Sequence, residues 1–182
     1  MCYHILSRCQ GLTPKHKLRF KNPLYSIDST TIDLCLSVFP WARFRKAKGA
    51  IKMHCLYDHS GALPSFMVVT DGKRHDARVV KESSFPLSPD SIVSVDKAYI
   101  DYNWLNSLDN NGVFFVTRAK RNIDCTVTEQ HQAASKKVRQ DAVISLNGPR
   151  TKKLYPKDLR LSMENDFLSK ALGRVGDPSA KR

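Results

Sequence analysis

Short apolar runs, each ended by turn-forming residues, divide the first two thirds of the chain into strands and helices. The runs that predict strands span residues 24–28, 51–57, 63–70, 91–96 and 113–117. Helical signals mark a short segment that Asp76 would cap and a second segment over 103–108, which stops at Asn110-Asn-Gly112. Between the first two strands, the pattern predicts a polar turn at 29–31 and an apolar run over 32–39.

Two of the predicted strands end in an aspartate, and these carry the first candidate chemistry. Asp28 closes the first strand and Asp96 closes the fourth, 68 positions further along the chain. The order of elements is strand, hairpin pair, helix, strand, helix and strand, which predicts a mixed α/β sheet. If the two strands are neighbours, their carboxylates converge and supply the minimum of oxygen ligands for Mg²⁺. The alternative is that both aspartates are turn or cap residues.

The charge balance points to a polyanionic partner. The chain has 30 Lys and Arg residues against 17 Asp and Glu residues, with a net charge of +13 and a pI near 9.7. Lysine and arginine that neutralise phosphates release condensed counterions, so nucleic acid is the leading candidate. An ordinary basic protein remains an alternative. A membrane-surface protein is disfavoured, because no basic amphipathic helix stands out.

Cysteine usage and hydropathy predict a soluble protein of the cytoplasm. The five cysteines are scattered and form no C-x-x-C pair, which disfavours a disulfide framework or a zinc ribbon. His54 and His59 have H-x4-H spacing, but they fall in the predicted hairpin, which disfavours a zinc site there. No apolar run is long enough to span a membrane, and the first residues lack the pattern of a signal peptide.

Several blocks around the two aspartates resemble the IS4 family of DDE transposases. They include Tyr-Ser-Ile-Asp28, Thr-Asp-Gly-Lys-Arg-His-Asp76 and Val-Asp96-Lys-Ala-Tyr-Ile-Asp-Tyr102. The resemblance covers roughly residues 5–160, and the blocks occur in the family's order. The family more often has Arg-Gly where this chain has Lys97 and Ala98. Because alanine takes positive φ less freely than glycine, we expect strain or reduced activity there.

The resemblance implies an RNase H-like, retroviral integrase-like fold, in which flanking helices pack on a mixed sheet that is truncated here. It divides the chain into a remnant of the N-terminal region (1–24), a partial RNase H-like catalytic core (25–118), part of a basic β-rich insertion (119–160) and a divergent, disordered tail (161–182).

The resemblance also implies the chemistry. Asp28 and Asp96 would be catalytic metal ligands in a two-metal site for Mg²⁺ or Mn²⁺. The partner would be double-stranded DNA, as transposon ends and as target DNA. The resemblance leaves the oligomeric state open. The protein would be bacterial and cytoplasmic, and it would associate with the nucleoid when DNA-bound.

The family's third ligand is a glutamate in a Tyr-x-x-x-Arg-x-x-x-Glu-like signature, which this sequence lacks. Glu164 lies on a candidate terminal helix without the Tyr and Arg partners, and Glu129 fits a surface position in the insertion. Only about 27 residues precede Asp28, and the likeness fades after Arg160. We therefore expect a fragment with impaired catalysis. A non-catalytic, DNA-binding transposase remnant is the alternative, and an unrelated basic nuclease or RNA-binding module is a third.

Basic residues in three places are candidates for contacts with the DNA backbone. They are Arg43, Arg45, Lys46 and Lys48 beside Trp41, then Lys97, and then Lys152 and Lys153 within the basic stretch 136–160. Trp41 could stack on DNA or anchor a solvated loop. His75 and Asp76 could help to place DNA or metal, although a helix cap is the favoured role for Asp76. Tyr99 and Tyr102 are interpreted as packing residues.

Overall fold

The computed structural model describes residues 21–35, 43–45, 48–132 and 138–164. Contacts divide the chain into two compact units, one ending at Lys120 and the other beginning at Arg121, and each is described by itself. Residues 1–20 of the predicted N-terminal remnant, and residues 165–182 of the predicted tail, lie outside the described residues.

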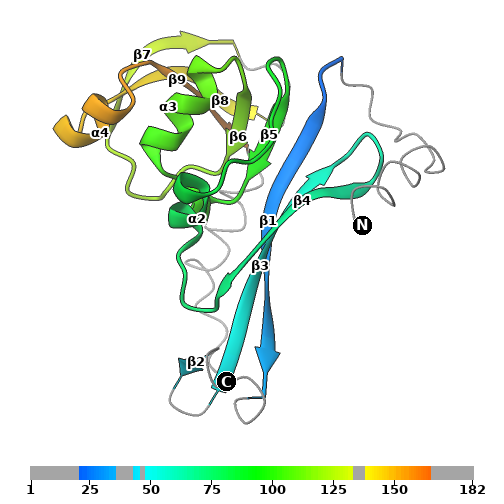
Figure 1. Cartoon of the computed structure of the whole chain (residues 1–182). Coiled ribbons are helices and arrows are strands. Elements are labelled where there is room, and N and C mark those ends of the chain that lie inside the picture. Colours follow the sequence, from blue (N-terminus) through cyan, green and yellow to red (C-terminus); the bar gives the residue numbers. More distant parts are fainter. Residues whose placement is uncertain (1–20, 36–42, 46–47, 133–137, 165–182) are drawn as a thin grey trace, which may run out of the picture. The chain divides into compact units, whose positions relative to one another are not determined.

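The first unit contains a mixed sheet in the order β2-β3-β1-β5-β6, with β4 also paired to β3 (Figure 1). Its strands are β1 (Leu24–Leu34), β2 (Arg43–Arg45), β3 (Lys48–Asp58), β4 (Leu63–Asp71), β5 (Ile92–Val95) and β6 (Phe114–Thr117). The pairs β1–β3 and β3–β4 are antiparallel, whereas β1–β5 and β5–β6 are parallel. The predicted hairpin and the mixed α/β sheet are therefore confirmed.

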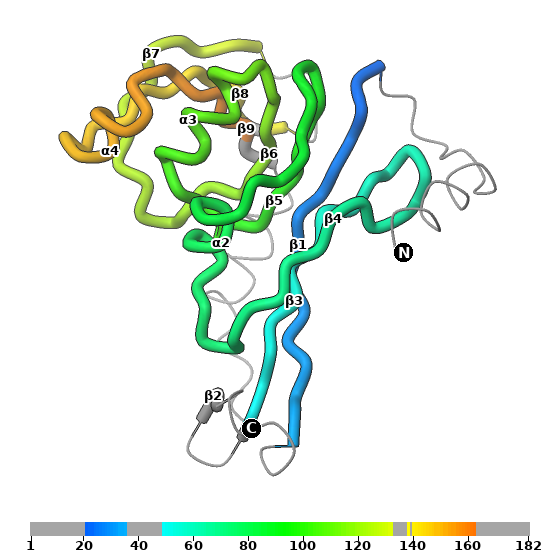
Figure 2. The backbone as a smooth tube through the Cα atoms, in the orientation of Figure 1, coloured from blue at the N-terminus to red at the C-terminus, as the bar shows by residue number. Residues whose placement is uncertain are grey.

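β1 is longer than the sequence pattern predicts. The predicted polar turn at 29–31 is wrong, because β1 runs on to Leu34 and stays paired with β3 along that whole length (Figure 2). Asp28 is consequently an internal residue of β1. The threonines and Ile32 of this segment are β-branched and favour extended backbone. The polar side chains of Thr30 and Thr31 are exposed to solvent.

The helices of the first unit are short and supply much of its core. They are α2 (Asp76–Glu82), the 3₁₀ helix η1 (Lys97–Tyr99) and α3 (Tyr102–Asn110). α3 ends where the sequence predicts, and Gly112 just beyond it has a φ of 70°. Buried side chains come from α2, η1 and α3: Val79, Val80, Tyr99, Trp104, Leu105 and Leu108.

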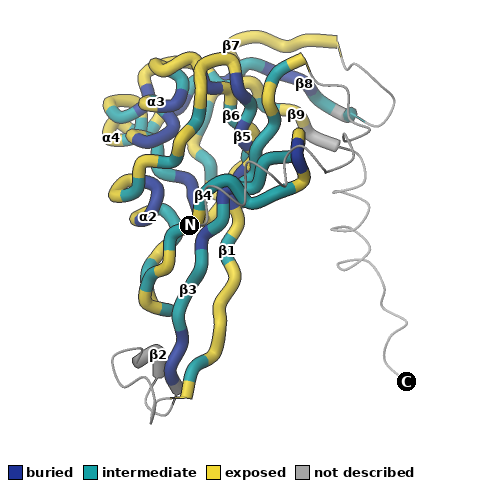
Figure 3. Tube along the Cα trace, turned by 45° about the vertical axis from the view of Figure 1, so that its right-hand side comes forward, coloured by how far each residue is buried: buried dark blue, intermediate teal, exposed yellow. Residues whose placement is uncertain are grey.

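The strands of the sheet contain residues of different burial (Figure 3), and the register assigns these residues to its two faces. Ile27, Leu56, Val93 and Val95 occupy matching register positions and are buried on one face. The alternate positions of the same strands point the other way. On that second face, large apolar side chains are exposed: Ile32, Met67, Val69, Phe114 and Val116.

The second unit is a three-stranded antiparallel sheet in the order β7-β8-β9. Its elements are β7 (Cys125–His131), β8 (Val138–Leu146), α4 (Pro149–Leu154) and β9 (Leu159–Glu164). The prediction of a terminal helix at Glu164 is wrong, because this residue ends β9 and pairs with Val138. β9 also continues past residue 160, where the sequence places the end of the insertion. Glu129 is exposed, as expected.

An ion pair between a buried carboxylate and an exposed arginine joins β8 and β9 of the second unit. Asp141 on β8 is 3% exposed and accepts two hydrogen bonds from the Arg160 guanidinium, at 2.9 and 2.5 Å. The Ser162 hydroxyl donates a third, at 3.3 Å. Arg160 and Ser162 both belong to β9. The arginine holds the pKa of the Asp141 carboxyl below its usual range.

Leu56→Ala should lower the free energy of unfolding by about 2–5 kcal/mol, because it removes a fully buried side chain from the covered face. Met67→Ala, on the neighbouring strand and the exposed face, should change it by no more than about 0.5 kcal/mol. Urea denaturation followed by far-UV circular dichroism measures both. Equal losses for the two variants would show that the faces are assigned incorrectly.

Candidate active site

Asp28 and Asp96 come together through the register of the parallel strands. The β1–β5 ladder ends with Ile27 opposite Val95, so Asp28 and Asp96 are the next residue on each strand. Neighbouring strands lie about 4.8 Å apart, and residues at matching positions of a parallel pair point to the same face. Both aspartates therefore belong to the face that is opposite to Ile27 and Val95. The two strands are thus neighbours, which is the condition under which the sequence predicts that these carboxylates converge.

The Asp96 carboxylate is held at the start of η1. Its Oδ1 accepts a hydrogen bond from the Ala98 N–H at 3.0 Å, and its Oδ2 lies 3.3 Å from the Arg118 guanidinium. The Ala98 N–H, and then Arg118, hold the pKa of Asp96 below its usual range despite partial burial. The expected backbone strain at Ala98 is not found, since Ala62 and Asp90 are the non-glycine residues with positive φ in the described chain.

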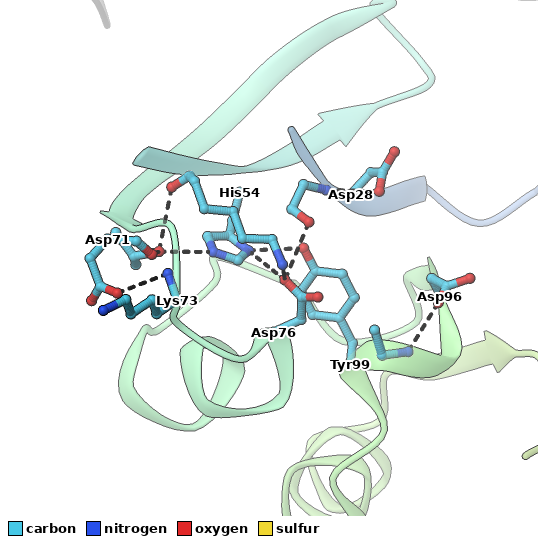
Figure 4. A network of polar contacts seen from close by, with 11 residues as sticks. Asp28, His54, Asp71, Lys73, Asp76, Asp96 and Tyr99 are labelled. Carbon is cyan, nitrogen blue, oxygen red and sulfur yellow. Dashed lines mark hydrogen bonds and ion pairs between the residues drawn. The ribbon is translucent and has the colours of Figure 1, made fainter. Parts of the chain in front are cut away.

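Asp28 is exposed and makes one local contact. Its Oδ1 accepts a hydrogen bond from the backbone N–H of Ser29 at 2.8 Å. Cys55 lies opposite it on β3, and burial, together with the negative charge of Asp28, raises the pKa of that thiol. In Figure 4 the Asp28 carboxylate points away from the polar side chains that lie behind β1.

The donor set of Asp28 and Asp96 suits a hard cation. Both are carboxylates, which Mg²⁺ and Mn²⁺ prefer, and both are at least partly open to solvent. Within the part of the chain that the structure describes, no group of three or more His, Cys, Asp or Glu side chains is placed to hold a metal ion. The pair thus supplies two ligands, and no third protein ligand is identified among the described residues.

A cluster of polar side chains lies behind Asp28, on the covered face of the sheet (Figure 4). At its centre is Asp76, the first residue of α2. Its Oδ1 is 2.7 Å from the Lys52 ammonium, 3.2 Å from the Ser29 hydroxyl and 3.5 Å from Nδ1 of His54. Asp76 is therefore not the helix cap that the sequence predicts. His75 occupies the cap position, without a side-chain cap hydrogen bond.

His54 and Tyr99 complete the cluster. Nδ1 of His54 is 2.9 Å from the Tyr99 hydroxyl, and its Nε2 is 3.2 Å from Thr70 Oγ1. Burial lowers the pKa of His54, and Lys52 adds to this effect, although Asp76 acts against it. Burial also raises the pKa of Tyr99, opposed by a hydrogen bond with Ser29. Both ring nitrogens of His54 thus have partners, and Nε2 of His59 lies 3.1 Å from Ser26 Oγ.

The predicted DNA contacts lie on several different elements. Arg43 and Arg45 lie on β2 and Lys48 begins β3, and Lys46 lies outside the described residues. Arg43 pairs with Gly49, six residues along β3 from the partner of Asp28, which is roughly 20 Å at 3.3 Å per residue. Lys97 is exposed beside Asp96. Lys152 and Lys153 are exposed on α4 of the second unit.

The sequence interpretation missed Arg118, Lys52 and Ser29. The sequence does contain a signal for Arg118, because this residue directly follows the predicted strand 113–117. In the structure, Thr117 is the last residue of β6 and pairs with Val95. Three successive parallel strands therefore place Asp28, Asp96 and Arg118 one residue beyond their last shared rung. No comparable signal marks Lys52 or Ser29, which are ordinary polar residues in strands.

The family model described as "Transposase DDE domain" matches residues 19–165. A Geobacillus stearothermophilus protein named "Probable transposase for insertion sequence element IS5377" is 32% identical over 120 residues, which is 66% of this chain and 31% of that protein. A Sinorhizobium fredii protein, y4zB, whose name also describes it as a transposase, is 30% identical over 106 residues, 58% of this chain and 29% of that protein. The chain thus spans about a third of the length of these relatives.

Among solved structures, the cryo-EM structure of a piggyBac transposase synaptic complex with hairpin DNA aligns with 76% of this chain and 32% of that chain. The TM-score is 0.36 and the sequence identity is 12%. In the described residues, no helix is long and apolar enough to cross a membrane.

The lowered pKa of His54 predicts how the stability of the first unit depends on pH. Because the unfolded chain binds this proton more tightly, the contribution of His54 is present above its unfolded pKa, about 6.5, and is lost as the pH falls. His54→Gln removes the titrating group. The difference in free energy of unfolding between the wild type and this variant should therefore be larger at pH 8 than at pH 5, measured by urea denaturation. A difference that grows towards acidic pH would instead mean that His54 is charged in the folded state.

Proposed function

The chain belongs to the family of transposase DDE domains, and we propose that it acts in DNA transposition as a transposase of the IS4 type. The proposed reaction is metal-dependent cleavage and transfer of DNA strands, with Asp28 and Asp96 as catalytic metal ligands. The observation that carries this proposal is the placement of both aspartates one residue beyond the last rung of neighbouring parallel strands. The order of the surrounding strands supports an RNase H-like fold.

The metal, Mg²⁺ or Mn²⁺ in a two-metal site, would activate the attacking oxygen and stabilise the leaving oxygen of the phosphodiester. The chain's own residues bind and orient. Asp28 and Asp96 offer hard oxygen donors on an open face of the sheet. Lys97 and Arg118, both exposed next to Asp96, offer positive charge to the phosphates of a bound strand. No nucleophilic side chain is required.

Double-stranded DNA is the proposed partner, as transposon ends and as target. The net charge of +13 supports a polyanion. We propose the basic residues of β2, the Lys48 position, Lys97, and the α4 pair Lys152 and Lys153 as backbone contacts. In this arrangement residues 25–118 form the catalytic core and residues 119–160 a basic insertion. The protein would act in the bacterial cytoplasm, on the nucleoid.

A plasmid-nicking assay tests the catalytic role of the two aspartates. With Mg²⁺ or Mn²⁺, the wild type should nick supercoiled DNA. Asp28→Ala or Asp96→Ala should slow nicking at least about a hundredfold, because even a small misplacement of the reacting groups has an effect of that size. Asp33→Ala is the matched control, since Asp33 is an exposed carboxylate on the same strand. It should nick as fast as the wild type.

Two results would contradict the proposal. Nicking that survives both substitutions would place the chemistry elsewhere. A wild type that binds DNA but never nicks it would favour the second candidate function, a DNA-binding transposase remnant without catalysis, which the basic charge supports equally well.

The double substitution Lys152→Gln and Lys153→Gln should weaken DNA binding at all sequences. If each lysine contacts one phosphate, the slope of log K against log salt should fall by about 0.9 for each. Fluorescence anisotropy with a labelled duplex at salt concentrations between about 50 and 200 mM gives this slope, because affinities that depend on phosphate contacts change strongly over this range. Lys73→Gln, an exposed lysine outside the proposed contacts, should leave it unchanged. An unchanged slope in the double variant would exclude α4 from the DNA interface.

A further inference from the structure

We propose that the buried hydroxyl of Tyr99, with Ser29, His54 and Asp76, positions Asp28 and Asp96 relative to each other. These four residues are called the bracing cluster. None of them would touch the metal, so they are positioning residues. The inference rests on the proposed function, and it assigns to Tyr99 and Asp76 a role beyond packing and helix capping.

The first reason is where the backbone ladder stops. Hydrogen-bonded pairing between β1 and β5 ends at Ile27 opposite Val95, immediately before the two aspartates. Beyond that rung the chain leaves the sheet at Asp96 and turns into η1, while β1 continues alongside β3. The register brings the aspartates to the same level, but the ladder between β1 and β5 no longer holds them there.

The second reason is that the bracing cluster bridges this same point. Tyr99 is 1% exposed and lies in η1, three residues after Asp96. Its hydroxyl is 2.9 Å from Nδ1 of His54 on β3. The same nitrogen lies 3.5 Å from Asp76 Oδ1, which accepts a hydrogen bond from the hydroxyl of Ser29, the residue after Asp28. Tyr99, which comes three residues after Asp96, is therefore linked through His54 and Asp76 to Ser29, which comes directly after Asp28.

The third reason is that a fourth element, α2, also joins the cluster. The Ser29 hydroxyl donates to Asp76 Oδ1 at 3.2 Å, and the Lys52 ammonium lies 2.7 Å from the same oxygen. Asp76 begins α2, so α2, β1, β3 and η1 meet in one set of contacts (Figure 4). Buried polar groups that are this fully paired resist displacement, because breaking one bond leaves another group unsatisfied.

Partners behind the ligands of a metal site typically change metal affinity 10–100-fold when they are removed. Loss of the Tyr99 hydroxyl should act in this way. The ring stays in the core, so the fold is retained, while η1 loses its bond to His54 on β3. Asp96 is then free to shift relative to Asp28, and the affinity for a divalent ion falls.

The test measures the binding of Mn²⁺ alone to the full chain. The electron paramagnetic resonance signal of free Mn²⁺ reports how much of the ion remains unbound. Tyr99→Phe should raise the Kd for Mn²⁺ at least about tenfold with an unchanged far-UV circular dichroism spectrum. Tyr102→Phe, which removes a hydroxyl from α3, is the matched control and should bind as the wild type does. Ser29→Ala should weaken binding in the same way, whereas Ser29→Thr retains the hydroxyl and should restore it.

The outcomes separate the two proposals. If the wild type binds no Mn²⁺, or if Asp28→Ala and Asp96→Ala leave binding unchanged, the proposed metal site fails and the bracing role fails with it. If those two variants lose binding but Tyr99→Phe and Ser29→Ala bind as tightly as the wild type, the metal site stands and the bracing role is wrong. The Ser29 pair decides the question even if Tyr99→Phe does not fold.

Discussion

The parallel pairing of β1 with β5 is the constraint on which the candidate site depends. Side chains alternate between the faces of a strand, so the rung Ile27–Val95 decides at once what is buried and what is presented. A slip of one residue would bury Asp96 and expose Val95. Core packing and site assembly therefore depend on the same register. The burial of Val93 and Val95 on β5 selects the pairing that also brings Asp96 level with Asp28.

Burying polar groups on the covered face of the sheet costs free energy. A carboxylate, an ammonium and an imidazole placed among apolar side chains are unfavourable unless each is paired. Here Lys52 neutralises Asp76, so His54 has no need to be charged, and burial lowers its pKa accordingly. A neutral imidazole can accept at one nitrogen and donate at the other. That allows it to bond both Tyr99 and Thr70, and so to link η1 with β4.

Much of the fold could be predicted from local pattern, because apolar runs ended by turn residues depend on near neighbours. The strands, the hairpin and α3 are of this kind, whereas the convergence of Asp28 and Asp96 depends on the long-range pairing of β1 with β5. The bracing cluster is not of this kind either, since Ser29, His54, Asp76 and Tyr99 come from four segments and resemble surface, turn, cap and packing residues when taken singly. The continuation of β1 through Ser29 and the strand at Glu164 were also missed, because pairing with β3 and β8 overrides a weak local signal.

The ion pair between Asp96 and Arg118 leaves Asp96 available as a ligand in the candidate site. The ion pair is 3.3 Å long, and its side chains are 78% and 40% exposed. Water screens such a pair, so it contributes about 0–1 kcal/mol, and a competing cation displaces the guanidinium at little cost. The Ala98 N–H bond acts differently, because it fixes the orientation of the carboxylate through the backbone while leaving lone pairs open. Asp96 is therefore held in direction and remains available as a ligand.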